Sequence, residues 1–89
     1  MSGKINRWAM GDFMRNVSMS MVEGGKLEIR AESGRLVAYN YDTQIKLIFA
    51  GDGIIHASRN GVEHSFDQHS CWNSGNGYVW AWLEKKFPA

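Results

Sequence analysis

The chain has 89 residues, of which 44% are hydrophobic and 12% aromatic, enough to build one packed globular domain over residues 1–89. Ten basic residues nearly balance nine acidic ones. The formal net charge of +1 therefore argues against an acidic nucleic-acid mimic and against a strongly basic nucleic-acid binder. The single cysteine, Cys71, excludes an internal disulfide framework and favours a reducing, cytoplasmic location. No apolar run approaches the length of a membrane span, so we expect no membrane partner.

The first predicted element is a helix from Met10 to Val22, where apolar residues recur at helical spacing. Asp12 is the candidate N-cap, and the pair Gly24-Gly25 is a stop signal. Trp8 lies just before this helix and is expected to pack beneath it.

Five short strand-like segments separated by turn residues come next. They are Lys26–Glu32, Arg35–Tyr41, Gln44–Ala50, Ile54–Arg59 and Val62–Phe66. Two-residue turns at 33–34 and 42–43 place the apolar side chains of the first three segments on one face of a sheet. A three-residue loop over 51–53, with Gly53 in the left-handed region, keeps Phe49 and Ile55 on that face. The Asn60-Gly61 turn pairs Ile55 with Phe66, which continues the apolar face onto the last hairpin.

The C-terminal part is expected to be helical. A short helix is predicted to begin within Gln68–Asn73, followed by a break over 74–77. Residues 78–87 alternate as a strand would and also form an apolar arc on a helical wheel. We expect a helix, because a strand would leave a second apolar face uncovered. The expected fold is α+β, a five-stranded antiparallel meander with an N-terminal and a C-terminal helix packed on one face. Trp80, at the border of the helical arc, is expected to be the most exposed tryptophan.

The histidines and the cysteine are the residues with metal-ligand or nucleophile chemistry, and their spacing decides whether they can act together. His56 and His64 point to opposite faces of the predicted hairpin, and His64-x4-His69-x-Cys71 matches no standard zinc spacing, so we expect no metal and no cofactor. Cys71 with His64 or His69 could form a nucleophile pair, but no family signature surrounds it, and Cys71-Trp72 is typical of a core. We expect a protein that is not an enzyme, with a Cys/His- or metal-dependent small enzyme as an alternative.

The second sheet face is the most informative predicted surface, because it carries tyrosine and aliphatic residues beside arginine and lysine. Such compositions are enriched at protein interfaces, although tyrosine and valine are also ordinary strand residues. The predicted partner-binding residues are Tyr39, Tyr41, Arg30, Lys46, His56, Val37 and Ile48. Homodimerisation through two such faces or through an edge strand is an alternative use of the surface. A further alternative is weak single-stranded nucleic-acid binding, with the tyrosines stacking on bases and Arg30, Lys46 and Arg59 meeting phosphates. The near-zero net charge makes nucleic acid the less favoured partner.

A pattern in the middle of the chain resembles small phage-encoded proteins of uncharacterised function. It consists of Tyr41-Asp42-Thr43-x-Ile45, a hairpin, Ser65 and then Gln68-His69-Ser70, and it covers about 30 residues. Residues 63–67 depart from it, since the pattern has a threonine-rich stretch there. The resemblance assigns no functional residue. It implies an accessory protein of a mobile element, acting in the host cytoplasm by binding a host protein and blocking it, a CRISPR-Cas component being one such target.

Overall fold

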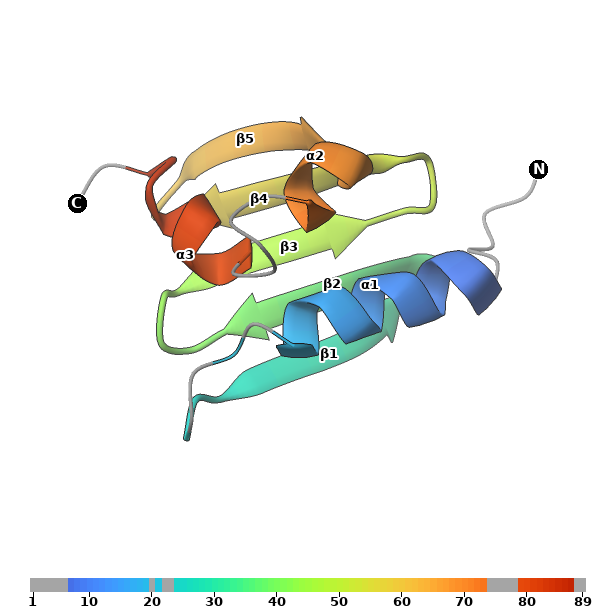
Figure 1. Ribbon diagram of the computed structural model, residues 1–89, viewed down its shortest axis with the longest axis horizontal. Helices are drawn as coiled ribbons and strands as arrows, with labels where there is room; N and C mark the ends of the chain where they lie inside the picture. The colour runs from blue at the N-terminus through green and yellow to red at the C-terminus, as the bar shows by residue number, and fades with distance from the viewer. Residues whose placement is uncertain (1–6, 20, 22–23, 74–78, 88–89) are drawn as a thin grey trace.

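Five strands form one antiparallel sheet in chain order in the computed structural model, which describes residues 7–19, 21, 24–73 and 79–87 (Figure 1). The strands are β1 (Leu27–Glu32), β2 (Arg35–Asn40), β3 (Ile45–Phe49), β4 (Ile54–Arg59) and β5 (Val62–Asp67). The helices are α1 (Arg7–Met19), α2 (Gln68–Trp72) and α3 (Val79–Glu84). The predicted α+β meander is confirmed, and its C-terminal part is helical.

The predicted register is confirmed in every hairpin, because the turns have the chemistry that each connection needs. The pairs Ser33-Gly34 and Asn60-Gly61 have positive φ at both residues, as a two-residue hairpin turn requires. Gly51 and Gly53 also have positive φ, and Phe49 pairs with Ile55. Four residues, 41–44, connect β2 to β3 rather than a two-residue turn, but the pairing of Asn40 with Ile45 keeps the predicted register.

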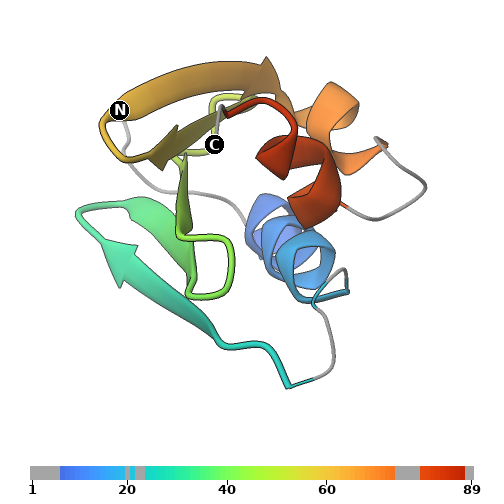
Figure 2. The same ribbon diagram turned by 90° about the vertical axis from the view of Figure 1, so that its left-hand side faces the viewer.

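All three helices lie on the same side of the twisted sheet, as Figure 2 shows. The core lies between the two layers and takes alternate residues from each strand, because alternate side chains of a strand share a face. Phe13 of α1 stacks on Phe49 of β3 with ring centroids 5.4 Å apart, and its ring meets Trp72 of α2 edge-on at 5.8 Å. On the other half of the sheet, Phe87 packs on His64 with centroids 4.9 Å apart.

The N-terminal helix differs from its prediction. It begins at Arg7 rather than at Met10, so Asp12 lies inside the helix and is not its N-cap. Its carboxylate instead accepts hydrogen bonds from Arg15 and Asn16 on the following turn. The earlier start also carries Trp8 to the side of α1 opposite the core, where 88% of the residue is exposed, so the prediction that Trp8 packs beneath the helix is wrong.

The prediction that Trp80 is the most exposed tryptophan is also wrong. Only 3% of Trp80 is exposed, and its indole Nε1 donates a hydrogen bond of 2.8 Å to the Val17 carbonyl of α1. The helical wheel of one segment cannot show this contact, because a second helix, distant in the sequence, covers that side. The predicted break over 74–77 lies outside the described residues.

Candidate interaction surface

The sheet face opposite the helices is called the outer face here, and cross-strand pairing arranges its side chains in rows. Among the described residues no helix covers it (Figure 2). One row runs Glu28, Tyr39, Lys46, Ser58, Glu63, and the next runs Arg30, Val37, Ile48, His56, Ser65. The register therefore brings six of the seven predicted partner-binding residues together in two adjacent rows, and Tyr41 joins them from the loop after β2.

Two tyrosines form an aromatic pair at one end of the outer face. The rings of Tyr39 and Tyr41 meet edge-to-face, with centroids 4.7 Å apart and planes 85° apart. This arrangement suits the ring quadrupoles. The Tyr41 hydroxyl donates a hydrogen bond of 2.6 Å to Glu28, and this bond, together with the nearby negative charge, raises the pKa of Tyr41 above its ordinary value. Half of Tyr41 remains exposed, so the pair is held in place and still accessible.

A buried side chain and a structured turn support Tyr41 from behind. Asn40, only 3% exposed, accepts hydrogen bonds through Oδ1 from the backbone N–H groups of Asp42 and Thr43 at 2.8 and 3.1 Å. Gln44 N–H closes the loop on the Asn40 carbonyl at 2.7 Å. These bonds fix the loop that carries Tyr41, and they explain why the connection holds a polar residue on the core face.

Ion pairs along β1 form one rim of the outer face. The Arg30 guanidinium lies 3.5 Å from the Glu28 carboxylate and 3.3 Å from that of Glu32. All three side chains remain between two-fifths and three-fifths exposed, so the pairs add little to stability. Their effect on the surface is to alternate positive and negative charge along its edge.

The aliphatic residues of the outer face, Val37 and Ile48, are covered by their neighbours and contribute little exposed surface. Val37 is 5% exposed although none of the described helices covers it, because its neighbours in the rows surround it. Ile48 beside it is half-buried. His56 is exposed, and its Nδ1 lies 3.0 Å from Ser65 Oγ. Of the predicted contacts, Val37 therefore offers the least surface to a partner.

Two open depressions on the outer face include residues that the prediction left out. One, of about 590 Å³, lies between Tyr39, Lys46, Ser58 and the β4–β5 turn, and the other, of about 260 Å³, is lined by Arg35, Ile48 and His56 among others. Both share Ser58 and Glu63. The parity of the β4–β5 hairpin could have placed both residues on this face, since Ser58 pairs with Glu63 across it.

The histidine and cysteine side chains do not assemble a reactive centre in the described part of the chain. Cys71 is fully buried, and burial raises the pKa of its thiol to about 12, so the nucleophilic thiolate is scarce at neutral pH. His64 packs against aromatic rings, while His69 is exposed on α2. No group of three or more His, Cys, Asp or Glu side chains among the described residues is placed to hold a metal ion.

Comparisons with protein-family models, with curated proteins and with solved structures gave no match for this chain. None of the helices that the structure describes has the length and apolar character needed to cross a membrane. The fold and its surface define a small two-layer α+β domain with one open sheet face.

Proposed function

We propose that this protein is a non-enzymatic protein-binding module and that the outer face is its contact surface. The observation that carries the proposal is the edge-to-face pair of Tyr39 and Tyr41 beside the half-buried Ile48, with charged side chains around them. An aromatic centre with a polar rim is typical of protein interfaces. Because Tyr41 is already held by Glu28, less side-chain freedom is lost when a partner binds.

The distribution of charge favours a protein over a nucleic acid. Glu28 and Glu32 flank Arg30, and Glu63 lies on the same face as Lys46. A phosphate backbone needs an uninterrupted positive track, and these carboxylates would repel it. A protein surface with its own mixture of charges suits such a rim better.

The sealed thiol argues against the alternative of a Cys-dependent enzyme. Cys71 is the buried residue of α2 and its side chain belongs to the core, so a substrate would have to open that core to reach it. Of the two histidines that could pair with Cys71, His64 packs against the rings of Phe66 and Phe87, and His69 is exposed on α2. Neither histidine makes the sealed thiol accessible to a substrate.

We extend the proposal to the kind of partner on the basis of the resemblance to small phage-encoded proteins. The partner is then a host protein, such as a CRISPR-Cas component, which the bound module blocks in the host cytoplasm. Blocking needs only a stable complex, and the composition of the outer face is suited to forming one.

The test compares proteins retained from host-cell lysate by the immobilised wild type with those retained by the Tyr39→Ala/Tyr41→Ala variant, using quantitative mass spectrometry. We expect one or a few host proteins to bind the wild type and to be reduced about tenfold or more with the variant, as for loss of an aromatic hot spot. Trp8→Ala is the matched control, because it removes an exposed aromatic side chain on the other layer.

Two results would overturn the proposal. One is a partner lost with Trp8→Ala and kept with the tyrosine variant, which would move the contact surface to α1. The other is tight binding of a single-stranded oligonucleotide that weakens steeply with added salt, which would favour nucleic acid. Circular dichroism of each variant shows that a lost partner does not reflect a lost fold.

A further inference from the structure

β1 is an edge strand of the sheet. Among the described residues it has a strand neighbour on one side only, β2, and it pairs with β2 over six consecutive residues without a bulge (Figure 1). Proline, a bulge or a charge on the apolar face are the usual protections of a sheet edge. β1 has none of them, because its charged residues all lie on the outer face.

The backbone of β1 directs alternate groups to the free edge. Tyr41 N–H donates to the carbonyl of Lys26, the residue directly before β1, and this bond sets the phase of the ladder. Since hydrogen-bonded and non-hydrogen-bonded pairs alternate in an antiparallel ladder, the even-numbered residues of β1 bond to β2. Leu27, Ile29 and Ala31 therefore direct their N–H and C=O groups away from β2, to the free edge.

The charges along this strand are complementary to themselves when the strand is reversed. Glu28, Arg30 and Glu32 alternate in sign on the outer face, and Lys26, which directly precedes β1, continues the alternation along the sequence. Placing a second β1 antiparallel, with Ile29 opposite the partner's Ile29, sets Glu28 opposite the partner's Arg30 and Lys26 opposite the partner's Glu32. All four resulting pairs are of opposite sign, and Leu27 meets the partner's Ala31 on the apolar side. The same register also aligns the outward backbone groups of the two strands.

We propose that the protein forms a two-fold symmetric homodimer through antiparallel pairing of β1 with β1 in this register. The two sheets then continue into one, and the outer faces of both copies lie side by side on it. Such an interface is isologous, so it closes after two copies and does not propagate into a filament.

Other registers and the other edge lack this complementarity. Moving the register by two residues in one direction places Arg30 opposite the partner's Arg30, and in the other direction Glu28 opposite the partner's Glu28. Both put like charges directly opposite, which is destabilising. On β5, Ser65 opposite itself would place Glu63 against Asp67, again with like charge.

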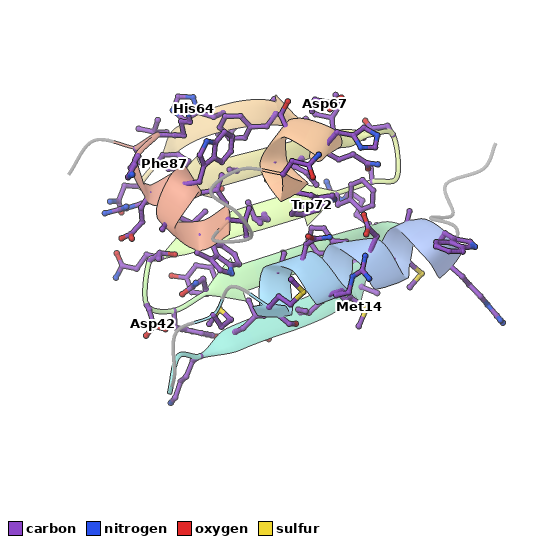
Figure 3. All side chains as sticks on the ribbon, in the orientation of Figure 1. Met14, Asp42, His64, Asp67, Trp72 and Phe87 are labelled. Carbon is purple, nitrogen blue, oxygen red and sulfur yellow. The ribbon has the colours of Figure 1, made fainter. Side chains whose placement is uncertain are left out.

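The apolar side of β1 has surface left for a second copy to cover. Leu27 and Ile29 reach the core only in part, and Ala31 is exposed. Met14, 42% exposed, lies on the side of α1 toward β1, as Figure 3 shows. A second β1 would add apolar contacts to Ile29, and the two copies of α1 would lie on the same side of the joined sheet.

The experiment measures mass in solution by sedimentation velocity and multi-angle light scattering over the concentration range that solubility allows. We expect the wild type to dimerise. Glu28→Lys and Arg30→Glu each place like charges opposite one another twice in the symmetric interface. Each should raise the dimer dissociation constant by about tenfold or more. The double variant Glu28→Lys/Arg30→Glu restores opposite charges in this register, so it should dimerise like the wild type.

Two further variants distinguish backbone pairing at β1 from a general effect of changing surface charge. Ala31→Pro removes an N–H that points to the free edge and leaves the ladder with β2 intact, so it should weaken the dimer without unfolding the domain. Glu63→Lys on β5 is the matched charge reversal at the opposite edge and should leave the dimer unchanged. A wild type that stays monomeric, a double variant that fails to recover, or a dimer lost with Glu63→Lys would each overturn the proposal.

Discussion

The indole Nε1 of Trp80 donates a hydrogen bond of 2.8 Å to the carbonyl of Val17, joining α3 to α1. Val17 lies in the last turn of α1, where carbonyl groups lack an N–H partner within their own helix. A side chain 63 residues away along the chain thus satisfies a buried acceptor that the helix leaves open. The bond ties the first helix to the last within the core.

Trp80→Phe removes this donor and leaves the Val17 carbonyl buried without it. We expect the free energy of unfolding to fall by about 1–3 kcal/mol, the usual loss for an unsatisfied buried group, measured by urea denaturation. Trp8→Phe is the control, because its exposed ring should change stability by no more than about 0.5 kcal/mol. Equal losses in the two variants would contradict this role of the indole.

Asn40→Ala removes the side-chain oxygen that accepts from two backbone N–H groups of the β2–β3 loop. We expect a loss of about 1–3 kcal/mol in the free energy of unfolding, since these donors lose a partner next to the core. Asn73→Ala, at the exposed end of α2, should cost about 0.5 kcal/mol or less. If the Asn40 variant is as stable as the wild type, water replaces the amide in the loop.

The Cys71 thiol should resist alkylation in the folded protein and react fully in denaturant, because burial raises its pKa to about 12. Because the pKa of the Cys71 thiol is higher in the folded protein than in the unfolded chain, its contribution to stability is fully present at pH values below the unfolded-state pKa. This contribution to the free energy of unfolding is lost as the pH rises from the unfolded-state pKa toward 12. Stability measured above pH 9 should therefore fall less in Cys71→Ala than in the wild type. Fast alkylation of Cys71 in the native protein at neutral pH would contradict the burial of its thiol in the core.

Glu28→Gln should lower the pKa of Tyr41 toward its ordinary value, since the carboxylate holds the hydroxyl proton by hydrogen bonding and by its charge. Because the pKa of Tyr41 is raised in the folded protein, the hydrogen bond stabilises the fold fully at pH values below the ordinary tyrosine pKa. This stabilisation is lost as the pH rises through the folded-state pKa of Tyr41. Tyrosinate absorbance against pH reports the change, and Tyr41→Phe identifies the Tyr41 part of the curve. An unchanged curve in Glu28→Gln would show that the 2.6 Å bond does not persist in solution.

The sheet could be predicted because the sequence signals that define it, turn residues and the alternation of apolar residues, lie close together in the chain. Each strand pairs with its neighbour in the chain, and turn chemistry such as Asn60-Gly61 fixes both loop length and parity. The same parity predicts that Tyr39, Lys46 and Arg30 share one face, as the strand register shows. The alternation of apolar and polar residues, together with the turn residues, was therefore enough to predict the sheet and the side chains that share its outer face.

The tertiary contacts of the helices could not be predicted in the same way. The burial of Trp80 depends on α1, and a helical wheel of residues 78–87 contains no information about that neighbour. The position of Trp8 depends on where α1 begins, and the ends of helices are the part of an element that a hydrophobic pattern marks least sharply. Asp67 was also missed as an N-cap, although it accepts from His69 and Ser70 N–H groups at the start of α2.

The chain-order pairing of the five strands has a consequence for the kinetics of folding. Short connections close each hairpin with little loss of chain entropy, so pairing can spread from one hairpin to the next. The junction of α1 with α3 instead requires the two ends of the chain to meet. We expect the sheet to assemble early and the helices to dock last, so the fluorescence of Trp80 should report the final step of refolding.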